Sequence, residues 1–232
     1  MKINKNSGIY FKSEDSKLSV IKPVLKSWIK IVEEYSTKMD WDACYWYNER
    51  ANISVLSGAA WKTPSWLALE EFGTVKHSKS KEAKTAHGRS DLYITKENHE
   101  NSFAIEAKQA WQNIGDNADH LNSTKIKFSG AWNDAGNLEK DEASTRVAAC
   151  FVTPYILKKQ FSTHESQFST KAQVELNEVV LKWLNSVNEN LKPDVIAWIF
   201  PQSDKKDQVK ELDGYVYPGV CLLLKIRSRS NK

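Results

Sequence analysis

The amino-acid sequence predicts an α/β fold, in which helices flank a mixed central β-sheet. Two segments with strong helical periodicity lie near the two ends of the chain, and apolar strand-like segments lie between and after them. The chain has 232 residues, of which 41% are hydrophobic. This length fits one large domain, and this composition is ample for a buried core. Helices and strands in this order favour a single α/β domain over residues 1–232.

Apolar residues at helical spacing predict helices over residues 22–38, 42–58, 64–72 and 171–190. Pro23 suits the first turn of the first helix, and Asp40 or Asp42 is the expected N-cap of the second. Residues 109–145 also look helical, although glycines interrupt the pattern. We expect residues 1–40 to form a helical extension that packs on the core.

Apolar segments rich in strand-forming residues predict strands over residues 90–94, 102–108, 147–153, 194–200 and 215–226. A polar link over residues 96–101 makes the first two strands a hairpin, and residues 74–77 are expected to form a further edge strand. The central hairpin is therefore the local unit in which side-chain positions are easiest to predict.

The central hairpin carries an unusual group of charged side chains. Alternate residues of a strand share a face, so Glu106 and Lys108 emerge side by side from an apolar segment. Antiparallel pairing of the two strands brings Asp91 beside Glu106. Converging carboxylates are the oxygen ligands that Mg²⁺ takes, and a neighbouring lysine positions a water or offsets developing negative charge. The alternative is a surface salt-bridge cluster at the edge of a sheet.

The spacing Glu-x-Lys alone is weak evidence, because it occurs twice in the chain. The other copy, Glu82-Ala83-Lys84, lies in a polar run without apolar flanks, and we interpret it as surface. Glu106-Ala107-Lys108 instead ends an apolar strand pattern that follows a Gly-Arg-Ser-Asp segment. Context therefore separates the two copies.

The segments GRSDLYI and FAIEAKQAW resemble the core motif of the PD-(D/E)XK nuclease superfamily. The resemblance implies a restriction-endonuclease-like fold and hydrolysis of phosphodiester bonds in DNA with Mg²⁺ or Mn²⁺. It further implies that Asp91, Glu106 and the carbonyl of Ala107 bind the metal, and that Lys108 orients the attacking water. Ser90 stands where the family has proline, and a turn residue is the alternative interpretation of this serine.

A helix that precedes the hairpin often supplies a further glutamate in this family, and Glu49 is the expected equivalent. At helical spacing Glu49 shares a face with four apolar residues, Trp46, Ile53, Leu56 and Ala60. A carboxylate on an apolar face must be paired, hydrogen-bonded or metal-bound. Glu49 is therefore a candidate metal ligand, with an ion pair to an unrelated cation as the alternative.

Substrate contacts are predicted more weakly, at Gln109, Arg89, Lys76 and Lys79. Cations neutralise backbone phosphates, and the net charge of +4 leans toward polyanionic partners. For Gln109 the preferred alternative is an ordinary polar residue at a helix start. For Arg89 surface decoration is an equal alternative, and for the lysine-rich segment over residues 76–81 a solvated loop is an equal alternative. Two rival functions stay open, a nucleic-acid-binding protein without turnover and a nuclease for RNA or DNA ends.

The three cysteines lie far apart and form no Cys-x-x-Cys pair, which argues against a zinc knuckle and a disulfide scaffold. The first residues are polar, unlike a signal peptide, and no segment approaches the ~20 apolar residues needed to span a bilayer. We therefore expect a cytoplasmic protein without a membrane partner. The resemblance to the PD-(D/E)XK superfamily is also compatible with a homodimer, because many enzymes of this kind act in pairs to cut both strands of DNA.

Overall fold

The computed structural model describes residues 3–14, 16–40, 42–77, 85–139, 141–160, 170–201 and 210–228. The helices and short 3-10 turns are η1 Lys17–Ile21, α1 Lys22–Lys38, η2 Cys44–Trp46, α2 Glu49–Trp61, η3 Glu97–His99, α3 Asn122–Asn137, η4 Lys158–Gln160 and α4 Thr170–Leu191. The strands are β1 Ser7–Phe11, β2 Trp66–His77, β3 Thr85–Lys96, β4 Ser102–Asn113, β5 Thr145–Leu157, β6 Val195–Ile199, β7 Lys210–Leu212, β8 Tyr215–Tyr217 and β9 Val220–Ile226.

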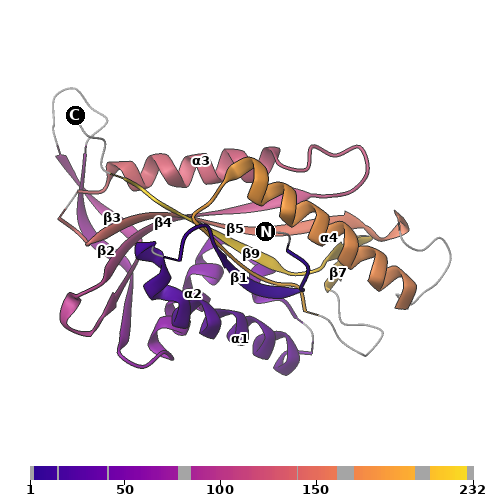
Figure 1. The fold of residues 1–232 in the computed structure, drawn as a ribbon, viewed down its shortest axis with the longest axis horizontal. Coiled ribbons are helices and arrows are strands. Elements are labelled where there is room, and N and C mark those ends of the chain that lie inside the picture. Colours follow the sequence, from indigo (N-terminus) through magenta and orange to yellow (C-terminus); the bar gives the residue numbers. More distant parts are fainter. Residues whose placement is uncertain are drawn as a thin grey trace.

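The strands form one mixed sheet in the order β1-β6-β9-β5-β4-β3-β2, and β8 pairs with the far end of β5 and with β7. β4 and β5 are parallel, and the other neighbours are antiparallel. Figure 1 shows α3 and α4 on one face of the sheet and α1 and α2 on the other. The predicted α/β fold with a mixed sheet flanked by helices is confirmed.

The central strand β5 is buried on both faces. Its residues Val147, Ala149 and Phe151 belong to the core shared with α1 and α2. Ala148, Cys150 and Val152 belong to the core shared with α3 and α4. Such alternation follows from the strand period of two, and a strand covered on both faces has a near-continuous run of apolar residues. The two cores therefore hold the sheet between two helical layers.

The helices predicted near the two ends of the chain are confirmed as α1 and α4. The expected helix over residues 64–72 is wrong, because this segment begins the strand β2. Trp66 and Ala68 are buried, whereas Leu67 and Leu69 are exposed, which is the period of a strand with one covered face. β2 pairs with β3 from Trp66 to His77, so the expected edge strand over residues 74–77 is its last part.

The expected broken helix over residues 109–145 is also wrong at its start. β4 continues to Asn113 because its ladder with β5 runs that far. The buried side chain of Gln112 then fixes the beginning of α3, since its Oε1 accepts from the backbone N of Thr124 at 3.1 Å and from the Thr124 hydroxyl at 3.0 Å. Within the described part of the expected helical region, the helix is α3, residues 122–137.

Two further boundaries differ from the prediction. The expected strand over residues 215–226 is divided into β8 and β9 by Pro218-Gly219. A Cβ at Gly219 would lie 2.1 Å from the carbonyl oxygen of Ile199, so only glycine permits this close backbone approach. The N-terminal segment, expected to be a helical extension, also adds the strand β1, which pairs with β6.

Candidate active site

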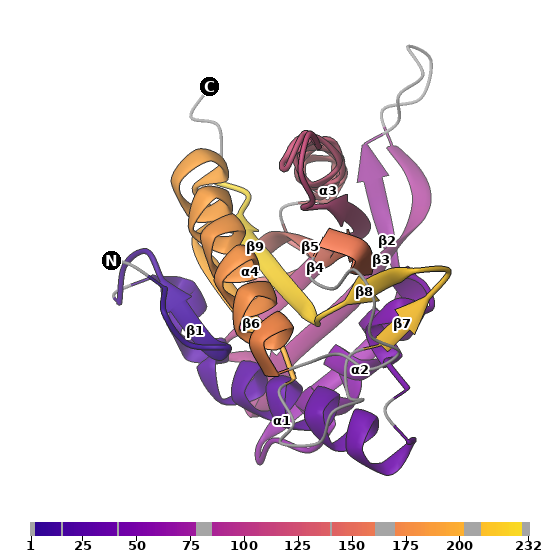
Figure 2. The same ribbon diagram turned by 90° about the vertical axis from the view of Figure 1, so that its right-hand side faces the viewer.

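The two strands of the central hairpin, β3 and β4, separate beyond the pair formed by Leu92 and Ile105, and we call this opening the fork. The β3–β4 ladder runs from Thr95 paired with Ser102 to Leu92 paired with Ile105, and ends there. β4 stays paired with β5 as far as Asn113. In Figure 2, β2 and β3 extend upwards beside α3, away from α1 and α2. The edge of β4 after Ile105 is therefore not covered by its neighbouring strand.

Carboxylates occupy the backbone donors that the fork leaves exposed on β4. The N–H of Ala107 donates to Oδ2 of Asp91 at 2.8 Å, and the N–H of Gln109 donates to Oε2 of Glu49 at 3.1 Å. Alternate N–H groups of a strand face the same edge. Asp91 and Glu49 thus lie next to each other along one edge of β4, although one comes from β3 and the other from α2.

Asp91 also lies at an interruption of the β2–β3 ladder. The register is the same on both sides of the gap, with Glu70 opposite Leu92 and Phe72 opposite Ser90, but Glu71 and Asp91 do not pair. Glu71 has a φ of 52°, which is uncommon for a residue other than glycine. The backbone at Asp91 is therefore outside both neighbouring ladders, and its carboxylate is free to turn toward β4.

The shared face predicted for Glu106 and Lys108 agrees with their surroundings. Phe103, Ile105 and Ala107 pack in the core against α1 and α2, so the alternate residues of β4 face α3. Lys108 contacts Asp134 of α3 accordingly, and Glu106 is only 3% exposed. A carboxyl group in this place is removed from water, in an environment where a bound cation would interact strongly with it.

Two oxygens hold the ammonium group of Lys108. Its Nζ donates to the carbonyl of Ala107 at 3.0 Å and lies 3.1 Å from Oδ2 of Asp134. Burial lowers the pKa of Lys108, but the contact with Asp134 and the charges of Glu49 and Asp91 outweigh it, so the pKa is raised. Lys108 is therefore a cation and a hydrogen-bond donor at neutral pH.

Glu49 is the first residue of α2, whereas the sequence predicts that it lies in the middle of a helix. The N-cap is Asn48, whose Oδ1 accepts from the N–H of Ala51 at 2.9 Å, so the expected caps Asp40 and Asp42 are wrong. Burial and the charge of Asp91 raise the pKa of Glu49, against the effects of Lys108, Gln109 and Lys127. Glu49 thus interacts electrostatically with both Asp91 and Lys108, as a member of the same site.

The turn before α2 is anchored on the sheet through the carbonyl of Tyr45. This oxygen accepts from Nε2 of Gln109 at 3.1 Å, from Oγ1 of Thr153 at 3.1 Å and from Nδ2 of Asn52 at 3.4 Å. Donors from β4, β5 and α2 therefore meet at one atom and fix where Glu49 leaves the turn. Groups that orient the residues of a site in this way determine its geometry.

Ser90 is a buried residue of β3 and not the turn residue considered above. Its Oγ donates to the carbonyl of Ile105 at 3.2 Å, with a longer contact of 3.4 Å to the carbonyl of Leu92. A serine at this position ties β3 to β4 at the last residue pair before the fork. Proline has no side-chain donor and could not make this contact.

The donor set of the fork suits a hard divalent cation. The carboxylates of Asp91, Glu106 and Glu49 and the carbonyl of Ala107 offer only oxygen atoms, as Mg²⁺ and Mn²⁺ prefer. Within the described residues, however, no three acidic, histidine or cysteine side chains are already arranged to hold an ion. Hydrogen bonds to Ala107 and Gln109 occupy one oxygen each of Asp91 and Glu49, so metal binding requires local rearrangement.

The predicted substrate contacts have different outcomes. Gln109 lies in β4 and not at a helix start, and its side-chain amide donates to the backbone carbonyl of Tyr45. Arg89 lies in β3, where it forms an ion pair with Glu71 at 3.3 Å. Lys76 belongs to β2, but its side chain lies outside the described part of the structure, as does the whole of Lys79.

Three charged residues near the site were not predicted: Arg50, Lys127 and Asp134. Arg50 directly follows the predicted ligand Glu49, so its position in the sequence already indicates that it lies near the site. Lys127 and Asp134 are separated by two helical turns of α3 and share one face of that helix. The helical periodicity of residues 109–145 alone does not reveal this relation, because α3 begins only at Asn122 and β4 runs to Asn113.

Comparison with known proteins adds no family assignment, since the chain matches no protein-family model, no curated protein and no solved structure. Among the described residues, no helix combines the length and the apolar character required to cross a membrane.

Proposed function

We propose that this protein is a divalent-metal-dependent nuclease that hydrolyses phosphodiester bonds in DNA. The observation that carries the proposal is the fork between β3 and β4. It brings Asp91 onto the edge of the strand that bears Glu106 and Lys108, and Glu49 joins them from α2. The motif-level resemblance to the PD-(D/E)XK superfamily supports the same reaction, with Mg²⁺ or Mn²⁺ as the metal.

The residues of the fork have separate roles in this proposal. Asp91 and Glu106 are the principal metal ligands, and Glu49 and the Ala107 carbonyl complete the set. A bound Mg²⁺ or Mn²⁺ would act as a Lewis acid on the phosphate and lower the pKa of a bound water. Lys108 donates hydrogen bonds, so it orients a water or offsets charge on a phosphate oxygen and does not accept a proton.

A guanidinium pair beside the fork provides a contact for the DNA backbone. Glu71 binds Arg50 at 3.1 Å and Arg89 at 3.3 Å, through different carboxylate oxygens. The side chains of Arg50 and Arg89 are 79% and 68% exposed. Because two guanidinium groups share the one carboxylate of Glu71, the three residues together carry a net positive charge. Because Arg50 follows Glu49 and Arg89 precedes Asp91 by two residues, a phosphate bound here lies next to the proposed metal site.

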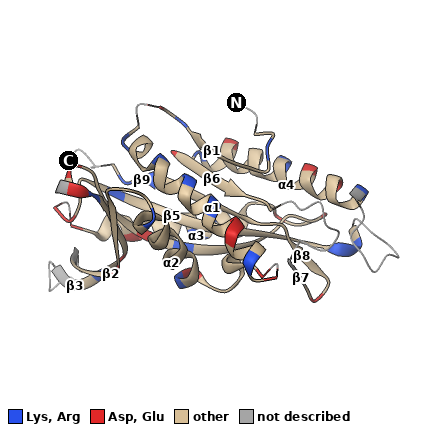
Figure 3. Cartoon of the chain, turned by 90° about the horizontal axis from the view of Figure 1, so that it is seen from below, with Lys and Arg blue, Asp and Glu red and all other residues tan. Residues whose placement is uncertain are grey.

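Overall charge supports the proposal only weakly. Lys, Arg, Asp and Glu are interspersed in the view of Figure 3, without a face of one sign. The net charge of +4 is small for a chain of 232 residues. Binding of DNA therefore depends on local groups such as the arginine pair, and not on a broad electrostatic field.

A substrate panel tests the proposed activity. Purified protein is incubated with supercoiled, linear and single-stranded DNA and with RNA, in Mg²⁺, Mn²⁺ or EDTA. We expect metal-dependent cleavage of DNA that EDTA abolishes. Cleavage of RNA alone, or of DNA ends alone, would change the proposed substrate and leave the proposed metal-dependent hydrolysis of phosphodiester bonds in place. Salt-dependent binding without cleavage in either metal would instead favour a nucleic-acid-binding protein.

Substitution of the arginine pair and substitution of Glu71 are expected to change the affinity for DNA in opposite directions. Arg50→Gln combined with Arg89→Gln should weaken DNA binding and reduce the slope of log affinity against log salt by up to about 2, one per phosphate contact. Glu71→Gln should strengthen binding at low salt, because it removes the carboxylate that competes with phosphate. Fluorescence anisotropy over a salt series in EDTA measures both effects. Equal affinity and slope in all three proteins would remove the arginine pair from the DNA-binding surface.

A further inference from the structure

A basic pocket lies where β5 begins and β9 ends, away from the fork. Its volume is about 530 Å³, and its lining consists of Lys17, Ala143, Ser144, Thr145, Arg146, Ile226, Arg227 and Ser228. Among these described lining residues three side chains are cationic, none is acidic, and three carry hydroxyl groups, of which that of Ser144 already donates to the carbonyl of Ser102 at 2.7 Å. The lining therefore offers hydrogen-bond donors and positive charge together.

Arg227 is held in position by aromatic stacking, a backbone hydrogen bond and close packing. Its Cζ lies 4.5 Å from the centre of the Trp132 ring, and its backbone N–H donates to the carbonyl of Arg146 at 2.8 Å. A Cβ on Gly136 would lie 2.9 Å from Nε of Arg227, so the glycine leaves the space that the guanidinium occupies. Stacking on Trp132 and close packing against Gly136 thus fix the position of this guanidinium.

Arg146 is ordered by the end of α3. Its Nη1 donates to the carbonyl of Leu138 at 2.8 Å, where the last carbonyls of a helix lack partners within the helix. In the β4–β5 register Arg146 lies opposite Ala104, and Cys150 lies opposite Lys108. Four strand residues span about 13 Å, so the pocket lies that far along the sheet from Lys108.

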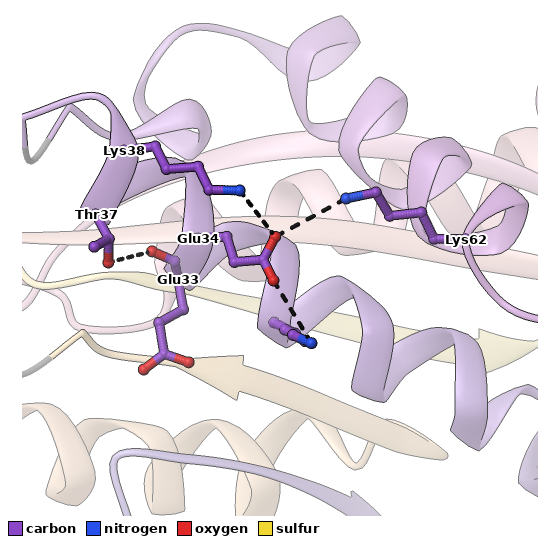
Figure 4. A network of polar contacts seen from close by, with 6 residues as sticks. Glu33, Glu34, Thr37, Lys38 and Lys62 are labelled. Atoms are coloured by element: carbon purple, nitrogen blue, oxygen red, sulfur yellow. Dashed lines mark hydrogen bonds and ion pairs between the residues drawn. The ribbon is translucent and has the colours of Figure 1, made fainter.

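A second cluster of lysines shows what a neutralised basic pocket looks like in the same protein. The smaller pocket between α1 and the end of α2, about 330 Å³, is lined by Lys26, Ser27, Lys30, Ile31, Glu34 and Lys62. Glu34 binds Lys30 at 3.6 Å, Lys38 at 3.7 Å and Lys62 at 3.9 Å (Figure 4). Here a carboxylate of the protein already occupies the anionic position, whereas no acidic residue lies among the described residues that line the basic pocket.

We propose that the basic pocket binds a phosphate group. A phosphate presents several acceptor oxygens and up to two negative charges, which match guanidinium forks, an ammonium and hydroxyl donors. Its source is either a free phosphate or a phosphate of a nucleic acid that extends from the fork. The phosphate site itself does not depend on the proposed nuclease activity, and only the second source rests on it.

Titration with inorganic phosphate, followed by isothermal calorimetry at constant ionic strength, tests the site. We expect the wild-type protein to bind phosphate, and Lys17→Gln and Arg227→Gln each to raise the dissociation constant about tenfold or more. Lys17 is exposed, so its substitution leaves the core intact. Lys26→Gln, in the pocket that contains Glu34, is the matched control and should bind like wild type. Absence of binding to wild type, or unchanged binding in both variants, overturns the proposal.

Competition distinguishes the two sources. A short single-stranded oligonucleotide is added to phosphate-loaded protein in EDTA, and metal-dependent cleavage is measured in separate samples. Displacement of phosphate, together with weaker oligonucleotide binding by Arg227→Gln, assigns the pocket to a nucleic-acid phosphate. Retention of phosphate assigns it to the free anion. If the wild-type protein cleaves DNA but does not bind phosphate, the pocket proposal alone is contradicted. If the wild-type protein binds phosphate but does not cleave DNA, the nuclease proposal alone is contradicted.

Discussion

Asp91→Asn is expected to reduce metal-dependent DNA cleavage on the order of 10²–10³-fold or more, with little change in stability. The amide keeps the size of the side chain and an oxygen that can accept from the N–H of Ala107, which lies 2.8 Å from Oδ2 in the wild type. What it removes is the negative charge that a divalent cation requires. The effect should therefore fall on turnover and metal affinity, and DNA binding in EDTA should be retained.

Asp116→Asn is the matched control for this substitution. Asp116 is exposed and lies in the connection between β4 and α3, away from the fork. Initial rates of plasmid nicking, measured over a Mg²⁺ series for both variants, make the comparison. Full activity in Asp91→Asn, or an equal loss in Asp116→Asn, would show that the reacting phosphate is not bound at the fork.

Trp28→Ala is expected to lower the free energy of unfolding by about 3–5 kcal/mol, the range for removing a large aromatic side chain from a core. Trp28 of α1 is 0% exposed, and its ring centre lies 6.5 Å from that of Phe151 in the central strand β5. The substitution therefore leaves a cavity between the helical layer and the sheet. Urea unfolding followed by circular dichroism measures the change.

Met39→Ala provides the comparison for Trp28→Ala, because Met39 follows α1 and is 53% exposed. It should change stability by no more than about 0.5 kcal/mol. Trp28→Phe should cost less than Trp28→Ala, since it keeps an aromatic ring and removes an indole N–H that has no acceptor within the described part of the protein. Equal effects of Trp28→Ala and Met39→Ala would mean that α1 does not unfold together with the sheet.

The elements that could be predicted from the sequence are those whose pattern is local. α1 and α4 repeat apolar residues at helical spacing over many turns, and β5 is apolar without interruption from Val147 to Val152, where both of its faces are covered. The sequence of β2 resembles that of a helix because the exposed Leu67 and Leu69 make its pattern apolar at neighbouring positions. Only its pairing with β3, a contact distant in sequence, determines that it is a strand.

The same distinction applies to the site. The nearness of Asp91 to Glu106 and Lys108 could be predicted, because both strands of the hairpin continue directly from its last pair, Leu92 with Ile105. That Asp91 leaves the ladder and accepts from the N–H of Ala107 could not. The contact of Lys108 with Asp134 depends on how α3 packs over β4, and the pairing of Arg50 with Glu71 on how α2 lies beside β2. Neither packing arrangement follows from local periodicity.

A crystal structure of the protein soaked in Mn²⁺ tests the central claim most directly, because manganese is located by its anomalous scattering. The fork should then hold an anomalous peak within coordination distance of both the Asp91 and Glu106 carboxylates, with the Lys108 ammonium moved away from the carbonyl of Ala107. An ordered fork without a peak at saturating Mn²⁺, or manganese bound only elsewhere, would contradict the account.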